Sequence, residues 1–197
     1  EVSTGGVSDL NIKERFTPLY SEYVEACSLN VGSTNLGKAV YCNPIDDVEY
    51  CVQEILKTKK TPEVEVFEIG HTNTMYELMK KYDFVNPVLF SIVLGHQGES
   101  PATPQALAAM IQMIPNDALW GITHANRRDF SIIGAALGMG ASTVRIGFED
   151  SNYLDPQTAV ETNLPIVEKT VRLLKAMDKN PMTPAEARKT FKIKDRM

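Results

Sequence analysis

Several features that mark particular protein classes are absent from this chain of 197 residues. Its three cysteines form no Cys-x-x-Cys pair, which argues against a disulfide framework or a zinc knuckle and favours reduced thiols in a cytoplasmic protein. No apolar run approaches the ~18 residues of a membrane span, and no secretory signal is visible. Basic residues form no stripe and acidic residues outnumber them 25 to 20, which argues against nucleic acid as a partner.

What is present is an average globular composition, with 43% hydrophobic and 23% charged residues. Short strand-like runs alternate with helical patterns along the chain. The strand-like runs are predicted at 24–29, 63–67, 88–94, 118–123 and 143–148, and residues 1–3 resemble the end of a sixth strand. Such alternation is typical of βαβ units and predicts a parallel sheet in a single domain spanning residues 1–197.

Capping signals predict where several of the intervening helices begin. Asn43 followed by Pro44 predicts an N-cap with proline at the first helical position. Thr103 precedes a proline in the same way, and Asn163 is expected to cap a helix over about residues 164–177. Thr183-Pro184-Ala185-Glu186 matches a capping box that opens a short terminal helix.

Two architectures fit this order of elements, an open doubly wound sheet and a (β/α)₈ barrel. The Gly-x-Gly-x-x-Gly and P-loop patterns of nucleotide-binding open sheets are absent from the sequence. Polar residues instead gather where predicted strands end, at Ser28, Glu65 and the Glu149-Asp150 pair. Barrel enzymes place their chemistry at that end of the strands, so the sequence favours a (β/α)₈ (TIM) barrel.

The segment from Arg145 to Asp150 carries the strongest chemical signal. Arg145 and Gly147 project to one face of the predicted strand, and Glu149 would join them if the strand continued. Two adjacent carboxylates after an arginine suit a metal ligand, Glu149, beside an ion pair in which Asp150 holds the guanidinium. A solvated acidic turn explains the same spacing, and the sequence alone leaves both interpretations open.

Other residues carry weaker signals with equally ordinary alternatives. Glu65 could act as a general base in a desolvated site or form an ion pair at the barrel rim. His96 lies in a loop with two glycines that is expected to shape a pocket, but the three histidines form no zinc pattern. Arg127-Arg128 could attract a phosphate, although such a pair is more often a surface feature. Cys27 and Ser28 have no histidine base nearby in the sequence, so a nucleophile is not favoured.

Taken together, the segments resemble the β-keto acid cleavage enzyme family in order and spacing, over essentially the whole chain. The matching segments are Ser3-Thr4-Gly5-Gly6, Cys27-Ser28-Leu29-Asn30-Val31-Gly32, Pro62-Glu63-Val64-Glu65-Val66-Phe67, Pro101-Ala102-Thr103-Pro104, Arg145-Ile146-Gly147-Phe148-Glu149-Asp150 and Thr183-Pro184-Ala185-Glu186-Ala187-Arg188. The resemblance implies a zinc-dependent barrel that condenses a β-keto acid with acetyl-CoA and releases acetoacetate and a new acyl-CoA.

The resemblance also implies residue roles. Arg145 and Asp150 would form a catalytic dyad that promotes enolate formation, with Glu65 as the third catalytic residue and Glu149 as a zinc ligand. The implied substrate-binding residues are Ser3, Gly5, Gly6, Ser28 and Asn30. Ser28 stands where the family has threonine, which keeps the hydroxyl but alters the fit.

The family's two remaining zinc ligands are histidines in a His-x-His pattern, which this sequence lacks. By the resemblance, the chain supplies about strands 4–8 of the barrel and the end of strand 3, and an N-terminal segment is expected to complete it. A homotetramer is also implied. The alternatives are a metal-dependent C–C lyase or aldolase that acts without CoA on the same barrel, and a non-catalytic fragment.

Overall fold

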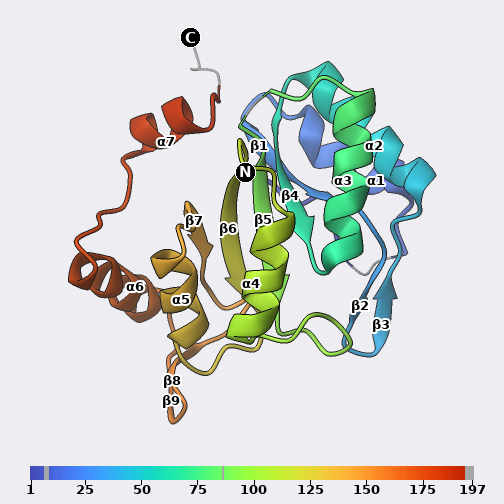
Figure 1. Cartoon of the computed structure of the whole chain (residues 1–197). Helices are drawn as coiled ribbons and strands as arrows, with labels where there is room; N and C mark the ends of the chain where they lie inside the picture. Colours follow the sequence, from blue (N-terminus) through green and yellow to red (C-terminus); the bar gives the residue numbers. More distant parts are fainter. Residues whose placement is uncertain (7–8, 86, 194–197) are drawn as a thin grey trace.

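A computed structural model describes residues 1–6, 9–85 and 87–193. Its centre is a parallel five-stranded sheet in the order β1-β4-β5-β6-β7 (Figure 1). These strands are β1 (Ala26–Asn30), β4 (Thr61–Val66), β5 (Leu89–Leu94), β6 (Leu119–His124) and β7 (Thr143–Arg145). The prediction of an α/β fold with a parallel sheet is therefore confirmed.

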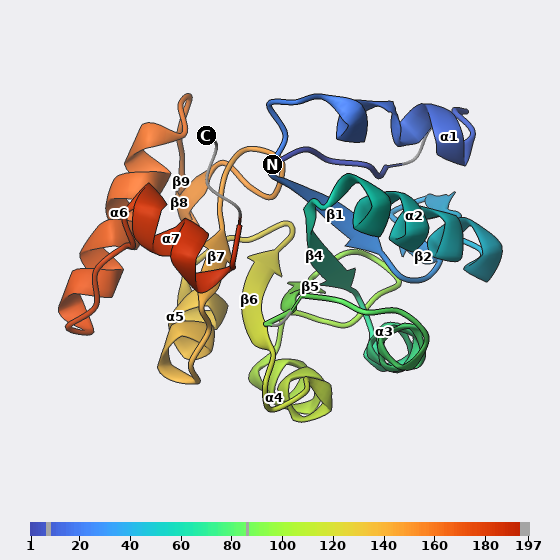
Figure 2. The same ribbon diagram turned by 90° about the horizontal axis from the view of Figure 1, so that it is seen from above.

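Helices connect the strands and pack on one side of the sheet, which is curved so that the helices lie on its outer face (Figure 2). They are α2 (Ile45–Thr58), α3 (Ile69–Lys81), α4 (Pro104–Met113), α5 (Ser131–Gly138) and α6 (Leu164–Ala176). In α2, Val48, Cys51, Val52 and Ile55 recur at helical spacing and are buried, so one stripe of the helix meets the sheet.

The core lies between this helical layer and the sheet. All six residues of β5, the central strand, are buried. Val64 and Val66 of β4 are also fully buried, whereas the alternate residues Glu63 and Glu65 line a cavity on the other face. Because side chains alternate along a strand, the same segment contributes apolar groups to the core and carboxyl groups to the concave side.

Shorter elements lie around this framework. At the ends of the chain these are α1 (Ile12–Arg15), a 3₁₀ turn η1 (Thr17–Tyr20) and α7 (Pro184–Thr190). Two hairpins, β2 (Thr34–Leu36) with β3 (Ala39–Tyr41) and β8 (Tyr153–Asp155) with β9 (Thr158–Ala159), lie beyond the carboxyl ends of the sheet strands (Figure 1). On the opposite side, Arg188 of α7 donates two hydrogen bonds to Glu25, at 2.9 and 3.0 Å.

The first residues of the chain lie beside β1 at the edge of the sheet, where a sixth strand would pair. Val2 pairs in parallel with Cys27 of β1: its N–H donates to Ala26 O at 3.0 Å, and its carbonyl accepts from Ser28 N–H at 3.1 Å. The interpretation of residues 1–3 as the tail of a further strand is confirmed by this bridge. No helix in the described residues is both long and apolar enough to cross a membrane.

The structure confirms two of the predicted caps and corrects two. Thr103 accepts a hydrogen bond from Ala106 N–H, and Thr183 forms the predicted capping box. Asn43 does not cap α2: the helix begins one residue later, with Pro44 at the N-cap, and Asn43 instead donates to Gly32 O. Asn163 occupies the N-cap of α6, but its side chain accepts from Phe148 N–H rather than from the helix.

Candidate active site

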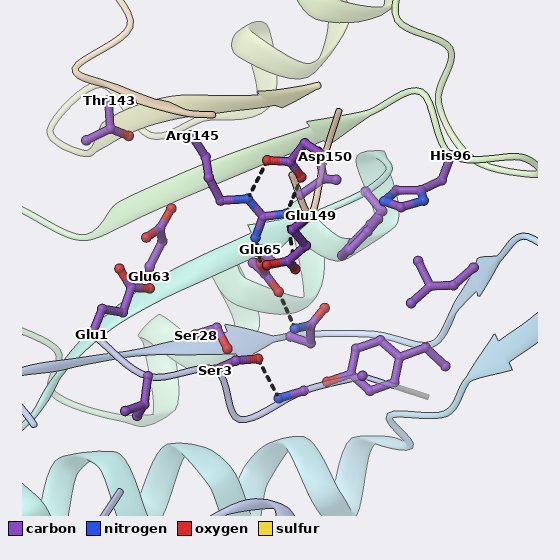
Figure 3. A pocket seen from close by; sticks show the side chains of 18 of the residues that line it. Glu1, Ser3, Ser28, Glu63, Glu65, His96, Thr143, Arg145, Glu149 and Asp150 are labelled. Atoms are coloured by element: carbon purple, nitrogen blue, oxygen red, sulfur yellow. Dashed lines mark hydrogen bonds and ion pairs between the residues drawn. The ribbon is translucent and has the colours of Figure 1, made fainter. Parts of the chain in front are cut away.

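A cavity of about 550 Å³ opens on the concave side of the sheet (Figure 3). It brings together residues from the first segment and from β1, β4 and β7, which are far apart in the sequence. All nine residues to which the family resemblance gives a role line it: Ser3, Gly5, Gly6, Ser28, Asn30, Glu65, Arg145, Glu149 and Asp150.

Arg145 lies at the centre of the polar part of the cavity. Its Nε and Nη2 atoms donate to the two carboxylate oxygens of Asp150, at 3.1 and 2.6 Å. Nη1 donates to Oε1 of Glu65 at 3.3 Å, and Nη2 lies 3.7 Å from a carboxylate oxygen of Glu149. One guanidinium is therefore shared among three carboxylates, of which Glu65 comes from β4 and the other two from the turn after β7 (Figure 3).

The electrostatics of this cluster favour a charged arginine. Burial alone would lower the pKa of Arg145, but the hydrogen bonds and charge of Asp150, together with Glu65 and Glu149, raise it well above its usual range. The side chain of Asp150 is only 5% exposed. This bidentate pairing fixes the plane of the guanidinium, because two parallel N–H groups match the two oxygens of one carboxylate.

Glu65 occupies a different environment from Asp150. Burial raises its pKa, while the charge of Arg145 and a hydrogen bond from Asn30 Nδ2 oppose that rise. Glu63, two residues earlier on β4, lines the same cavity beside Glu1 (Figure 3). Both glutamates of β4 thus face inward. A carboxyl group with a raised pKa beside a fixed cation is a better proton acceptor than an ordinary glutamate and is suited to exchange a proton with a substrate.

The first segment forms one wall of the cavity and is held by β1. Thr4 N–H donates to Ser28 Oγ at 3.0 Å, and Thr4 Oγ1 donates to Ser28 O at 2.7 Å. Ser28 Oγ therefore accepts a bond from the protein, and it also lies 3.4 Å from Thr4 Oγ1, to which its own proton can be donated. Ser3 is exposed, and its Oγ accepts from Gly5 N–H at 3.3 Å.

Gly5 lies where the wall contacts Tyr41. A Cβ atom at Gly5 would stand 2.2 Å from Tyr41 Oη, which is too close for any residue other than glycine unless the ring moves. Tyr41 was not singled out from the sequence, because its three-residue strand gives no recognisable pattern. Phe67 and Thr143 also line the cavity and were missed for the same lack of a motif.

His96 and His71 lie in different parts of the structure. His96 lines the cavity, as expected for its loop, and its ring centroid lies 6.0 Å from that of Phe67; burial lowers its pKa. His71 is buried outside the cavity, where its Nδ1 accepts from Phe67 N–H.

Cys27 is also buried, and burial raises its pKa to about 12, so it is a protonated thiol at neutral pH.

Glu149 differs from its predicted placement on the strand. β7 ends at Arg145, so Glu149 does not continue the strand face; the chain turns after Gly147, whose φ is 148°. Asp150 N–H donates to Gly147 O at 3.1 Å within this turn. The Glu149 side chain is 82% exposed and borders the cavity, which makes its carboxylate available to an external partner.

The described residues do not by themselves complete a metal site. Among residues 1–6, 9–85 and 87–193, no group of three or more His, Cys, Asp or Glu side chains is arranged to hold a metal ion. Glu149 fits the role of one ligand, since it is accessible and its only ion-pair contact with Arg145 is long. A zinc ion here would need further ligands from outside these residues.

Comparisons with known proteins show which family the chain belongs to. A sequence model of the beta-keto acid cleavage enzyme family matches residues 1–193. The chain is 31% identical to a 3-keto-5-aminohexanoate cleavage enzyme of Acetoanaerobium sticklandii and 30% identical to one of Fusobacterium nucleatum, covering 97% and 98% of this chain and 70% of each relative. It is 25% identical to a 3,5-dioxohexanoate:acetyl-CoA acetone transferase of Paraburkholderia graminis, over 98% of this chain and 71% of that protein.

A solved structure shows a related fold. The apo form of ObcA superposes with a TM-score of 0.67 at 16% identity, over 86% of this chain and 44% of ObcA. The chain therefore spans less than half of that structure, and the likeness concerns the fold alone. The family match over almost the whole chain, together with the two relatives at 30% identity or above, shows that this chain belongs to the beta-keto acid cleavage enzyme family.

Proposed function

We propose that this protein condenses a β-keto acid with acetyl-CoA and releases acetoacetate and an acyl-CoA. The observation that carries the proposal is the position of Arg145, held by Asp150 and facing Glu65 in the cavity. Family membership supports the reaction class. The relative from Paraburkholderia graminis and one from Cupriavidus necator carry acetyl-CoA in their names.

The roles follow from the contacts of the cavity. Enolate formation from a β-keto acid places negative charge on an oxygen, and a fixed guanidinium stabilises such charge when water is excluded. Asp150 keeps Arg145 in that orientation, so Asp150 acts as a positioning residue. Glu65 is proposed to transfer the proton at the substrate carbon, since it is buried, hydrogen-bonded by Asn30 and adjacent to the cation.

The opposite wall is proposed to hold the substrate. The Ser28 hydroxyl makes only a long contact of 3.4 Å to Thr4 Oγ1 besides the bond that it accepts, and Ser3 is exposed at the cavity, so both hydroxyls can turn to donate to the substrate carboxylate. Gly5 and Gly6 bring the backbone close to the ligand without side-chain bulk. Asn30 has a buried Oδ1 atom without a hydrogen-bond partner among the described residues, which suits a donor group on the substrate.

The proposal includes a zinc ion, and Glu149 is the one described residue that is proposed to bind it. The cavity presents three carboxylates to one guanidinium, so a divalent cation would balance the excess negative charge. When bound, zinc would polarise the keto carbonyl of the substrate. Its other ligands would come from outside the described residues.

We also propose that the five-stranded sheet is part of a (β/α)₈ barrel. Its curvature, its outer helical layer and the bridge of Val2 to Cys27 at one edge support this arrangement. The cavity at the carboxyl ends of the strands is where barrel enzymes carry their active sites.

A labelling experiment on the complete natural protein tests the reaction. The protein is incubated with a panel of β-keto acids and acetyl-CoA labelled with ¹³C at the carbonyl carbon. The proposed transfer moves the acetyl group onto the carboxymethyl fragment of the keto acid, so C3 of acetoacetate gains the label. Keto acid cleavage that proceeds without acetyl-CoA would instead support a CoA-independent lyase, and a lack of turnover across the panel would contradict the enzyme proposal.

A further inference from the structure

A second cavity, of about 390 Å³, lies next to the candidate active site. It is formed by two loops, residues 126–128 after β6 and residues 148–153 after β7. Glu149 and Asp150 line both cavities, so the two spaces adjoin at these carboxylates. The reaction roles proposed above use only the first cavity, and the second has no assigned purpose.

Arg127 is buried against this second cavity with unused hydrogen-bond donors. The residue is 2% exposed, and its Nη1 and Nη2 atoms have no hydrogen-bond partner among the described residues. Its guanidinium carbon lies 4.1 Å from the ring centroid of Phe130. A buried guanidinium without acceptors is costly, because it has lost its water without replacing those hydrogen bonds.

The charges of Asp150 and Asp129 oppose the effect of burial on Arg127, but neither carboxylate accepts a hydrogen bond from its Nη atoms. Both oxygens of Asp150 accept hydrogen bonds from Arg145, and Oδ1 of Asp129 accepts from Ser131 N–H at 2.8 Å. The guanidinium of Arg127 therefore has free N–H donors that a group from outside the described residues can bind. Only an anion offers both a compensating charge and acceptor oxygens.

Arg128 supplies a second cation at the rim of the same cavity. It is exposed, and its guanidinium carbon lies over the ring of Tyr153 at 3.8 Å from the centroid, a cation–π contact that restrains the side chain. Within the part of the chain that the structure describes, Arg128 makes no hydrogen bond or ion pair. Stacking leaves the N–H groups at the guanidinium edge free to bind oxygen atoms.

Hydrogen bonds join the two loops and hold the segment with both arginines in place. Asn126 N–H donates to Asp150 O at 2.8 Å, and Ser151 Oγ donates to Arg127 O. These bonds tie the loop that carries both arginines to the turn that carries Glu149 and Asp150. The second cavity is thus built on the same backbone that orients Arg145.

We propose that the second cavity is a phosphate subsite that holds a phosphate group of the acyl-CoA. Arginine binds phosphate through paired N–H groups, and barrel enzymes frequently bind phosphate in the loops after their seventh and eighth strands. In the barrel proposed above, β6 and β7 are those strands. The inference rests on the proposed function, because acetyl-CoA is the reactant that carries phosphates, whereas the β-keto acid binds in the first cavity.

The test compares two thioesters with the complete natural protein. Acetyl-CoA carries the phosphates, whereas S-acetyl-N-acetylcysteamine carries the same thioester without them. Arg128→Ala is expected to raise KM for acetyl-CoA about tenfold, the effect of losing one charged hydrogen bond, and to leave KM for the short thioester and for the keto acid unchanged. Arg172→Ala is the matched control, because Arg172 lies on α6 with 67% of its side chain exposed.

A second variant and a binding measurement keep the outcomes distinct. Arg127→Lys keeps the charge but not the paired donors, and it should also weaken acetyl-CoA binding if it remains folded by circular dichroism. Inorganic phosphate should compete with acetyl-CoA in the wild type and much less in Arg128→Ala.

Acetoacetate formation with an unchanged KM for acetyl-CoA in Arg128→Ala would overturn the subsite and leave the proposed function intact. A rise in KM for the keto acid alone would also overturn it. If no β-keto acid is turned over, calorimetry of CoA binding decides: binding that Arg128→Ala weakens supports the subsite without the reaction, and no binding contradicts both.

Discussion

At the scale of single residues, Arg145 determines what the surrounding carboxylates can do. It contacts Asp150, Glu65 and Glu149 with decreasing closeness, at 2.6, 3.3 and 3.7 Å. Asp150 is buried and accepts two hydrogen bonds from Arg145, whereas Glu149 is exposed and makes only a long ion pair with it. The three acidic groups therefore have different chemical capacities although they share one cation: Asp150 orients it, Glu65 can exchange a proton, and Glu149 remains free to bind elsewhere.

Asp150→Asn should lower kcat at least about 10²-fold while KM for the β-keto acid stays within about twofold. The amide keeps the size of the side chain but can no longer accept both guanidinium hydrogen bonds as a charged partner, so Arg145 loses its fixed plane. Initial rates of acetoacetate formation check this. Asp117→Asn, an exposed turn residue, is the matched control. A variant that keeps wild-type kcat would remove Asp150 from the mechanism.

Glu65→Gln should separate activity from stability. Activity should fall about 10²-fold, because glutamine cannot exchange the proton. Burial raises the pKa of Glu65 above 4.5, so the folded state binds its proton more tightly than the unfolded state does. The stability that this group contributes is complete below about pH 4.5 and is lost as pH rises through the raised pKa. Wild type should lose unfolding free energy over that range relative to the variant.

Urea unfolding at several pH values measures this difference, with the exposed Glu161→Gln as control. At pH 8 the Glu65→Gln protein should be at least as stable as the wild type. A variant that is less stable at pH 8 than at pH 4, relative to wild type, would show that the pairing of Glu65 with Arg145 outweighs its burial.

Part of the cavity was predictable from the residues, because Glu65 and Ser28 lie on predicted strands that pair in parallel and so come close together. Ser3, Gly5, Gly6 and Asn30 had a role only through the resemblance to the family, since no local pattern marks them. The orientation of Glu149 was not predictable, since it depends on a turn at Gly147 rather than on strand alternation. Tyr41 and Thr4 contribute through contacts between segments distant in sequence, and no local pattern encodes those contacts.

At the scale of elements, some helices and strands were easier to predict from the sequence than others. The helix that contains Val48, Val52 and Ile55 was found from its apolar stripe, but its start was misplaced by one residue because Asn43 bonds to Gly32 instead. The two hairpins were missed, since strands of two or three residues are too short to show alternation. Periodicity identifies elements that pack along a whole face, whereas short surface strands are fixed by their partners.

The contact between β6 and β7 depends on Gly121. A Cβ atom there would lie 1.8 Å from Thr143 Oγ1 and 2.9 Å from Thr143 O, so β7, which carries Arg145, would have to shift. Gly121→Ala should lower the free energy of unfolding by about 1–3 kcal/mol and reduce activity.

Gly134→Ala is the matched control, because it lies within α5 with no atom within 4 Å of its added Cβ, and it should gain up to about 1 kcal/mol. Chemical denaturation of both variants measures the difference. A Gly121→Ala protein as stable as wild type would show that Thr143 rotates away without displacing the strand.

At the scale of the whole molecule, the sheet supplies a framework and the site needs more than its described residues provide. The sequence predicted the parallel sheet correctly because buried strands and amphipathic helices alternate so regularly. The described strands form an open five-stranded sheet, and no group of three metal-binding side chains lies among the described residues, so the proposed barrel and zinc site do not follow from these strands.

The last prediction concerns zinc in the complete natural protein. Elemental analysis of the wild type should find about one zinc per chain, and prolonged chelation should remove both zinc and activity, with activity returning on zinc addition. Glu149→Gln should lose zinc, because its carboxylate is 82% exposed at the cavity beside Arg145 and an amide is a poor substitute for it.

His96→Ala is the informative control. His96 also lines the cavity and is a common ligand type, yet it packs beside Phe67 and belongs to no described group of three ligands. It should therefore retain zinc. Zinc retained by Glu149→Gln and lost from His96→Ala would reverse the assignment. Zinc would then be held in the same cavity through His96, and the Glu149 carboxylate would have no role in binding it.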